Sequence, residues 1–163
     1  MKKGLVLVCL MILLTGCAGV ETMETVSDDW ITPVDAPLGQ LILELPASAS
    51  AQASLSSEAG ELYLCDGYFI TVQTMDRGDL DRTCRTLCGL GAERVDMMEL
   101  EVSSQKRWDW VWSSASEEGD CVGRAAVIDD GSYHYCVSVM APAAAAGSLE
   151  VEWTALFASF AVD

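Results

Sequence analysis

Residues 122–140 read VGRAAVIDDGSYHYCVSVM, two apolar runs on either side of the dipeptide Asp130-Gly131. An Asp-Gly pair between apolar runs indicates a β-hairpin, because the tight turns that join antiparallel strands favour these residues. With Asp130 and Gly131 as the two loop residues, Ile128 is expected opposite Tyr133. Side chains alternate between the two faces of a strand, and the face predicted to enter the core holds Val122, Ala126, Ile128, Tyr133, Tyr135, Val137 and Val139.

A second hairpin is predicted over residues 61–75, with Asp66-Gly67 as a type I′ turn between the apolar runs 62–65 and 68–72. The segment 38–45 is rich in Leu and Ile and is predicted to be a strand that ends at Pro46. Residues 47–60 consist almost wholly of Ala, Ser, Gln, Glu and Gly, a composition that indicates a mobile low-complexity loop.

Two further strands are predicted over residues 95–103 and 107–113. In the first, Met98, Leu100 and Val102 alternate with acidic residues, the pattern of a half-buried strand with its apolar face on the core. The second carries three tryptophans on a single face: Trp108, Trp110 and Trp112. Such a stripe could stack on sugar rings or receive a peptide, but the mostly polar opposite face favours a stripe covered by helices.

Two helices are predicted from apolar residues at helical spacing. The first runs from residue 78 or 79 to about residue 87 and is stopped by Gly89. Its apolar face holds Leu80, Cys84, Leu87 and Cys88. The second is expected to follow a spacer over residues 143–147, with Ser148 as its N-cap. Its apolar stripe holds Leu149, Trp153, Leu156, Phe157 and Phe160.

Taken in order, these elements predict an α+β fold: an antiparallel sheet with an internal helix and a C-terminal amphipathic helix packed on it. The order of the elements and the ending Phe157-Ala158-Ser159-Phe160 resemble PsbP-like sandwiches over residues 38–162. The resemblance is one of fold and implies no activity and no residue role.

The N-terminus has the three parts of a secretory signal peptide: Lys2-Lys3, an apolar run over residues 4–14, and small residues before Cys17. The run of 11 residues is shorter than the roughly 20 that a membrane-spanning helix needs. The tetrapeptide Leu14-Thr15-Gly16-Cys17 resembles the lipobox of bacterial lipoproteins. This resemblance implies cleavage after Gly16, a diacylglyceryl thioether on Cys17 and a fatty acyl chain such as palmitate on the new amino terminus.

An ordinary signal peptide with a chance cysteine is the alternative explanation. If Cys17 is lipidated, the protein is anchored in the cell envelope, because two or three acyl chains hold a protein on a membrane. The residue after the cysteine is Ala18 and not Asp. By the sorting pattern of Gram-negative lipoproteins, this implies the outer membrane, facing the periplasm, if the host is Gram-negative.

Cleavage leaves residues 17–37 as a lipidated cysteine with an acidic tether and residues 38–163 as a single domain. Removal of residues 1–16 takes away two lysines and no acidic residue, so the formal net charge changes from −16 to −18. Nucleic-acid phosphates and anionic lipids repel a chain this acidic. Nucleic-acid binding is therefore excluded, and the lipid on Cys17 is the expected contact with the membrane.

Of the seven cysteines, Cys9 is removed with the signal peptide and Cys17 carries lipid. Five then remain: Cys65, Cys84, Cys88, Cys121 and Cys136. Disulfides are expected in an oxidising compartment, and the odd number leaves one thiol free or paired with another molecule. In the predicted register Cys121 and Cys136 lie roughly 14 Å apart along the ladder, too far for a mutual bridge. Each is expected to pair with one of the other three cysteines, and a Cys84–Cys88 bridge within one helix is disfavoured.

The other candidates for chemistry have structural explanations. His134 is the only histidine and lies about 7 Å from Cys136 on the same strand face, too far to activate its thiol. The cysteines lack a zinc-binding spacing, so no metal and no other cofactor is predicted. Helix capping and turns account for the acidic residues Asp76, Asp79, Asp81, Asp129 and Asp130, which do not match a calcium loop. Arg77-Gly78-Asp79 spells an integrin-binding tripeptide but is interpreted as the start of a helix.

The sequence therefore predicts a membrane-anchored envelope lipoprotein that acts as a non-enzymatic binding or assembly module and has no catalytic residues. Its contact surface is expected to be the sheet or the tryptophan strand, and its partner an envelope protein or a glycan. The alternative is a periplasmic thiol-redox or other enzyme that uses the unpaired cysteine.

Overall fold

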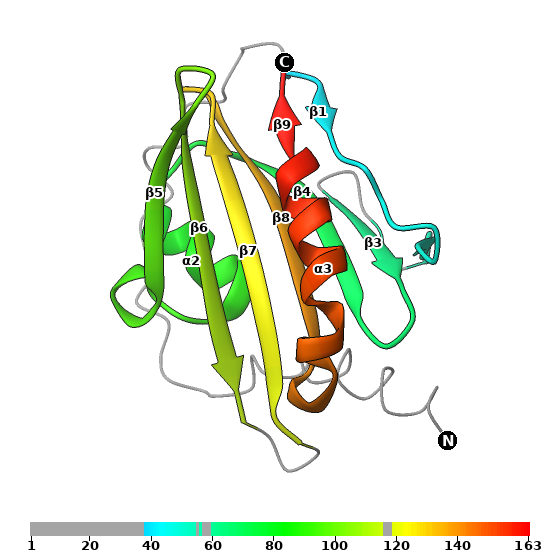
Figure 1. The fold of residues 1–163 in the computed structure, drawn as a ribbon. Coiled ribbons are helices and arrows are strands. Elements are labelled where there is room, and N and C mark those ends of the chain that lie inside the picture. The colour runs from blue at the N-terminus through cyan, green and yellow to red at the C-terminus, as the bar shows by residue number, and fades with distance from the viewer. Residues whose placement is uncertain (1–37, 55, 57–59, 116–118) are drawn as a thin grey trace. The chain divides into compact units, whose positions relative to one another are not determined.

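A computed structural model describes residues 38–54, 56, 60–115 and 119–163, all within the unit of residues 37–163 (Figure 1). The main feature is a seven-stranded antiparallel sheet with the order β2-β3-β4-β8-β7-β6-β5. Its strands are β2 (Ser50–Ala51), β3 (Gly60–Leu64), β4 (Phe69–Asp76), β5 (Asp96–Val102), β6 (Gln105–Ser114), β7 (Cys121–Asp129) and β8 (Tyr133–Pro142). Two α-helices, α2 (Leu80–Cys88) and α3 (Ala143–Ser159), pack on this sheet, and a 3-10 turn, η1 (Ala92–Arg94), follows α2. The predicted α+β fold is confirmed.

The two helices lie on opposite faces of the sheet (Figure 1). On one face α2 forms a core with the tryptophan stripe and its neighbours; the buried members are Cys84, Leu87, Trp108, Trp110, Trp112, Ala125, Val127 and Cys136. On the other face α3 packs on β7 and β8. Its buried residues are Leu149, Trp153, Leu156 and Phe157, followed by the buried Phe160. Both predicted apolar stripes are therefore core stripes, and the inner strands are buried on both faces.

The helix α2 has the ends that its sequence predicts. Asp79 is the N-cap, and its carboxylate accepts a hydrogen bond from the Asp81 backbone N–H at 3.2 Å. Gly89 ends the helix with a φ of 73°, a left-handed conformation that glycine adopts without steric cost.

The hairpin turns differ in detail from the predicted ones. Asp66-Gly67 are the two central residues of the β3–β4 turn as predicted, since Leu64 pairs with Phe69 and Cys65 N–H donates to Tyr68 C=O at 2.9 Å. The type I′ assignment is wrong, because Gly67 has a positive φ of 88° but Asp66 does not. Both positive values occur instead in the β5–β6 turn, at Ser103 and Ser104, with φ of 51° and 68°.

The predicted register of the β7–β8 hairpin is wrong, because the turn is centred one residue later in the chain than predicted. Ile128 pairs with Tyr135 and not with Tyr133, so Gly131 and Ser132 are the central turn residues. The cause is the Asp130 carboxylate, whose Oδ1 accepts hydrogen bonds from the backbone N–H groups of Ser132 and Tyr133, both at 2.7 Å. The shift moves paired positions by two residues, so every side chain keeps its predicted face.

The helix α3 begins at Ala143, five residues before the predicted start at Ser148. The stretch Ala143–Gly147 is the first part of the helix and not a spacer, because alanine has the highest helix propensity of all residues. Ser148 lies within the helix, and its hydroxyl donates to Ala145 C=O at 2.7 Å. Pro142 takes the N-cap position without a side-chain hydrogen bond.

The C-terminus of α3 is held by a buried arginine of the sheet. The Arg107 guanidinium donates to the backbone carbonyls of Phe157 at 2.9 Å and Phe160 at 3.2 Å. It also forms a two-pronged ion pair with Asp109, at 2.7 and 3.0 Å. Helix C-terminal carbonyls lack partners within the helix and attract positive charge, so Arg107 fixes the position of α3 on the sheet.

The burial predicted for residues 95–103 is wrong. Met98, Leu100 and Val102 of β5 are exposed, and it is Met97 that packs against the α2-side core. In the pairing of β5 with β6, Leu100 lies opposite Arg107, which places these three residues on the face that carries α3. That helix covers β7 and β8, while β5 and β6 lie beside it (Figure 1).

The segment 38–45 forms only a short strand, β1 (Leu41–Ile42), which pairs with β9 (Ala161–Val162). The predicted loop over residues 47–60 includes β2, and its residues 55 and 57–59 lie outside the described part of the chain, as do the predicted signal peptide and tether over residues 1–37. Among the described residues, neither helix has the length and hydropathy of a membrane-spanning segment.

Candidate functional site

An exposed apolar surface lies on the uncovered part of the α3 face of the sheet. It consists of Met98, Leu100 and Val102 of β5 with Val111 of β6, and we refer to these four residues as the β5 surface. Met98 and Val111 are more than half exposed, at 59% and 56%, although β-strand residues of this kind normally lie in a core. Exposed apolar side chains that gather on one face are a common feature of contact sites for other molecules.

The backbone of β5 adds a second feature, because β5 is the last strand of the sheet. Its seven residues pair with β6 in unbroken register from Asp96↔Val111 to Val102↔Gln105, without a bulge. It contains no proline and no lysine, which are two of the means of protecting an edge strand, although it carries three carboxylates. At the opposite edge of the same sheet, β2 has only two residues. The β5 edge therefore offers N–H and C=O groups to an added strand.

The charges on β5 are all of one sign. The strand carries Asp96, Glu99 and Glu101 and no basic residue. Lys106 of β6 lies 3.5 Å from the Glu99 carboxylate, in an exposed ion pair of small energetic value. An added strand with basic side chains would thus be attracted to this edge.

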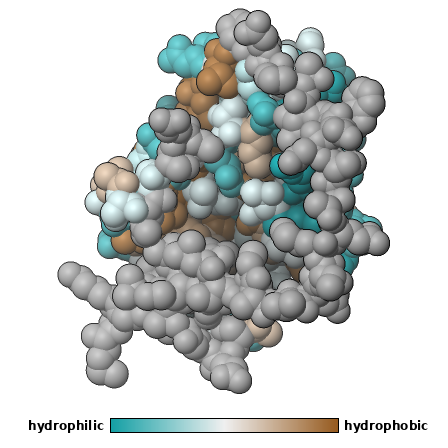
Figure 2. Space-filling model, turned by 180° about the vertical axis from the view of Figure 1, so that it is seen from behind, coloured by the Kyte–Doolittle hydropathy of each residue, from teal (hydrophilic) through white to brown (hydrophobic). Residues whose placement is uncertain are grey.

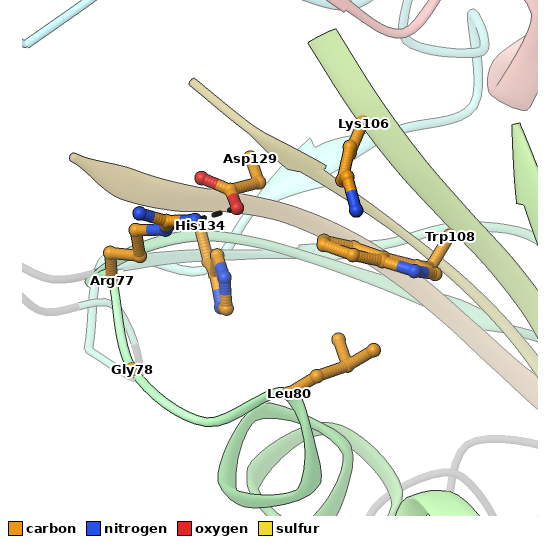
Figure 3. Close-up of a pocket in the computed structure, with 7 residues that line it drawn as sticks. All are labelled: Arg77, Gly78, Leu80, Lys106, Trp108, Asp129 and His134. Atoms are coloured by element: carbon orange, nitrogen blue, oxygen red, sulfur yellow. Dashed lines mark hydrogen bonds and ion pairs between the residues drawn. The ribbon is translucent and has the colours of Figure 1, made fainter. Parts of the chain in front are cut away.

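A pocket of about 420 Å³ lies on the other face, where the start of α2 meets the ends of β6, β7 and β8 (Figure 3). Its lining residues are Arg77, Gly78, Leu80, Lys106, Trp108, Asp129 and His134. Figure 3 shows Lys106 and Trp108 on one side, Arg77 and Asp129 on the other, and the His134 ring between them. Seen from this side of the molecule, the described surface is a mixture of hydrophilic and hydrophobic residues (Figure 2).

Polar contacts hold the walls of the pocket in place. Arg77 Nε donates to Asp129 Oδ2 at 3.1 Å, and Asp129 Oδ1 accepts from the Gly131 backbone N–H at 2.7 Å. The buried His134 ring has its Nδ1 2.8 Å from the Thr83 hydroxyl of α2 and lies edge-on to Trp108, with ring centroids 6.0 Å apart. Burial lowers the pKa of His134 below its ordinary 6.5, so the imidazole is neutral at pH 7.

The tryptophan stripe lies in the core beneath α2. The exposed fractions of Trp108, Trp110 and Trp112 are 8%, 2% and 8%. Only Trp108 also lines the pocket, and its indole N–H donates to Glu99 at 3.0 Å. As a row of three, the stripe presents little surface to a glycan or a peptide.

The structure does not support the expected disulfides: none joins Cys65, Cys84, Cys88, Cys121 or Cys136 in the described part of the chain. Cys121 lies opposite Pro142 and Cys136 opposite Val127, so these two are far apart on the ladder, as predicted. Burial raises the pKa of Cys84 to about 12 and that of Cys136 further, which keeps both thiols protonated and poorly nucleophilic. Burial also raises the pKa of Cys65.

Acidic residues that were considered as calcium ligands have structural roles in caps, turns and ion pairs. Besides the cap at Asp79 and the turn at Asp130, Asp81 pairs with Arg85 at 2.7 Å within α2. In the described ranges no group of histidine, cysteine and acidic residues is arranged to hold a metal ion. Cys17, the predicted lipidation site, lies outside the described residues.

The pocket and the β5 surface are the sites that sequence reasoning missed. The alternation of Met98, Leu100 and Val102 was visible, but its interpretation as a core face assumed a helix above it. The pocket collects side chains from four separate segments. Arg77, Trp108, Asp129 and His134 each stand out in the sequence for a different reason, but no local pattern indicates that they meet.

The sequence matches no protein-family model and no curated protein. Solved structures do match. The cyanobacterial PsbP protein CyanoP from Synechocystis sp. PCC 6803 has a TM-score of 0.56 and 8% identity, over 80% of this chain and 96% of that chain. The Ran-binding protein Mog1p from Saccharomyces cerevisiae has a TM-score of 0.52 and 14% identity, over 75% and 89%. At such identities the likeness is one of fold, and the predicted PsbP-like architecture is what the chain shares with these proteins.

Proposed function

We propose that the protein is a lipid-anchored, non-enzymatic binding module of the cell envelope whose β5 surface receives an extended segment of another envelope protein. The observation that carries this proposal is the long, regular β5 edge beside four exposed apolar side chains. An extended segment that adds a strand gains main-chain hydrogen bonds from the edge and specificity from alternate side chains. Met98, Leu100 and Val102, at every second position, are spaced for such contacts.

The charge of β5 defines the partner further. Two copies of this strand paired about their midpoint would place Glu99 against Glu99, and like charges directly opposite destabilise a sheet. The mature chain, with a formal net charge of −18, would also repel a second copy. The partner segment we propose is therefore extended, apolar on one face and basic on the other.

The location in the envelope rests on the N-terminal sequence. The lipobox-like Leu14-Thr15-Gly16-Cys17 supports a lipid anchor on Cys17, and Ala18 supports the outer membrane of a Gram-negative host. Metabolic labelling with a palmitate analogue, followed by membrane fractionation, tests this part. We expect label and membrane association for the native chain and neither for the Cys17→Ala variant. A labelled or membrane-bound Cys17→Ala chain would contradict the anchor.

Site-specific photocrosslinking in intact cells tests the contact surface. A photoreactive amino acid at position 98 should capture one partner protein, whereas the same group at position 151 should not. Val151 is the matched control, because it is apolar and 84% exposed but lies on α3. Equal capture at both positions, or capture only of a second copy of this chain, would contradict the proposal.

The captured partner then allows a test of strand addition. Its binding should slow amide hydrogen exchange over residues 96–102, because the free edge of β5 becomes hydrogen-bonded. Leu100→Lys should weaken binding about thirtyfold, the effect of roughly 2 kcal/mol expected for a central apolar contact. Val151→Lys should leave binding unchanged. Unchanged exchange in β5 would show that the partner binds elsewhere.

A further inference from the structure

We infer that the pocket between α2 and the sheet binds the oxyanion group of a small organic acid, a carboxylate or a phosphate. The inference concerns the face opposite the β5 surface and uses other residues, so it stands or falls independently of the proposed function. It rests on a count of hydrogen-bond donors and acceptors, on the charge of the lining residues and on the shape of the pocket.

Each carboxylate oxygen in the lining already accepts a hydrogen bond. Both oxygens of Asp129 accept hydrogen bonds, Oδ2 from Arg77 and Oδ1 from the Gly131 backbone. The donors are not used up to the same extent. A guanidinium has five N–H groups and an ammonium three. In the described structure Arg77 donates to the Asp129 carboxylate and, at 3.5 Å, to the Gly131 carbonyl, and Lys106 has the Glu99 carboxylate beside it. The pocket therefore offers donors to a ligand that is rich in acceptors.

Positive charge is scarce in this protein, which makes its concentration here informative. The whole chain has nine lysines and arginines, and two of them line this one pocket. The side chains of Arg77 and Lys106 are 54% and 63% exposed, so both can move toward a ligand. Oxyanions are the ligands that arginine and lysine bind through charge-assisted hydrogen bonds.

Two carboxylates oppose this charge: Asp129 in the lining, which pairs with Arg77, and Glu99 beside Lys106. Glu99 also accepts from the Trp108 indole, but it is itself more than half exposed and outside the lining of the pocket. Solvent screens an exposed pair of this kind, so a ligand in the pocket can compete for the ammonium.

The remaining walls suit the body of an organic acid. The ring of Trp108 and the side chain of Leu80, which lies below it in Figure 3, supply apolar surface to the pocket. A volume of about 420 Å³ lies within the range of small-molecule sites. The ligand class we infer is thus an acid with a ring or short apolar body, its oxyanion between Arg77 and Lys106.

His134 gives this site its own reporter, because it is the only histidine of the chain and its buried ring lies in the pocket wall. The experiment is an NMR titration of the purified, detergent-solubilised protein that follows the single set of imidazole signals. The probes are benzoate and phenyl phosphate, with uncharged benzamide as the matched neutral compound. We expect saturable shifts of the His134 signals with the two acids and none with benzamide.

Three variants distinguish specific binding in the pocket from nonspecific attraction of the acids by positive charge. Lys106→Gln should weaken the binding of benzoate about tenfold, the loss expected for one charge-assisted hydrogen bond. Glu99→Gln should strengthen it, because it removes the carboxylate that competes for Lys106. Arg82→Gln, an equal change of charge at an exposed position of α2 outside the lining, should leave it unchanged.

Equal weakening by Lys106→Gln and Arg82→Gln would overturn the inference, because it would mean that net charge alone attracts the acids. Binding of benzamide as tightly as benzoate would overturn it too, since the pocket would then be an apolar site. Shifts that do not saturate with either acid would show that the site is absent. None of these results bears on β5, where the partner is tested by crosslinking.

Discussion

The strands β8 and β5 are both rich in apolar residues, yet they differ in how far their side chains are buried. Every residue of β8 except Pro142 is buried, whereas no residue of β5 is. The difference lies in what packs on them: β8 lies inside the sheet, and β5 lies at its edge beside the helix that covers the inner strands.

The dimensions of the elements explain this difference. A helix with its side chains is about 10–12 Å wide and strands are about 4.8 Å apart, so one helix covers roughly two strands. The single helix α3 therefore cannot cover a face of seven strands. In the described part of the chain, what α3 leaves uncovered at β5 is apolar.

The largest effect is expected at Arg107, where the inner sheet is tied to α3. Arg107→Leu removes the donors to the carbonyls of Phe157 and Phe160 and leaves the buried carboxylate of Asp109 without its closest counter-ion. We expect the free energy of unfolding to fall by about 3 to 5 kcal/mol, measured by urea denaturation. Lys106→Gln, one position earlier on β6 and exposed, should change it by less than about 0.5 kcal/mol. A similar loss of unfolding free energy in both variants would contradict the expectation that the buried Arg107 matters more for stability than the exposed Lys106.

A smaller effect is expected at Gly123 of β7. A side-chain methyl at this position would overlap the ring of Trp112, so Gly123→Ala should lower the free energy of unfolding by about 1 to 3 kcal/mol. The matched control is Gly147→Ala in α3, where a methyl meets open space. That variant should gain about 0.5 to 1 kcal/mol, because alanine is the better helix residue. Equal stability of the two variants would indicate that the core on the α2 side is loosely packed.

The burial of His134 predicts a dependence of stability on pH. Burial lowers its pKa in the folded state below the ordinary 6.5, against the opposing effects of Asp129 and Asp130. The unfolded chain then binds more protons below about pH 6.5, so stability falls as the pH drops through this range.

Denaturation at pH 7.5 and pH 5.5 measures this effect. The slope contributed by one group is at most about 1.4 kcal/mol per pH unit. His134→Gln cannot take up the proton, so the difference between the two pH values should be smaller in this variant than in the native chain. An identical difference in both would contradict a buried, neutral His134.

The smallest effect on stability is expected at the β5 surface. Met98→Lys places a charge on an apolar strand residue, yet the free energy of unfolding should change by less than about 0.5 kcal/mol, because this side chain is exposed. Thermal or urea denaturation checks it. A loss above 2 kcal/mol would mean that Met98 is part of the core and that β5 is not an open surface.

Much of the fold could be predicted because the decisive signals are local. Asp79 marks the start of α2 and Gly89 marks its end. Asp66 and Gly67 lie at the centre of the β3–β4 turn. The apolar stripe from Leu149 to Phe160 identifies the last helix. Each signal depends on the chemistry of a few neighbouring residues and does not require a view of the whole chain. The start of α3 at Ala143 was predictable as well, from the helix propensity of its alanines, but the position of Ser148 suggested a later start.

Turn dipeptides and periodicity thus predicted the antiparallel sheet, the two helices and which side chains share a face, because turn chemistry, alternation and helical spacing are properties of the local backbone. Two things depended on the packed structure. On the face that carries α3, both β5 and β8 have apolar residues at alternate positions, and the strand order together with the placement of α3 made one a surface and the other a core. The pocket exists only in the folded sheet, because its donors come from separate segments. The turn after β4 places Arg77 against Asp129, and β6 contributes Lys106 to the same pocket.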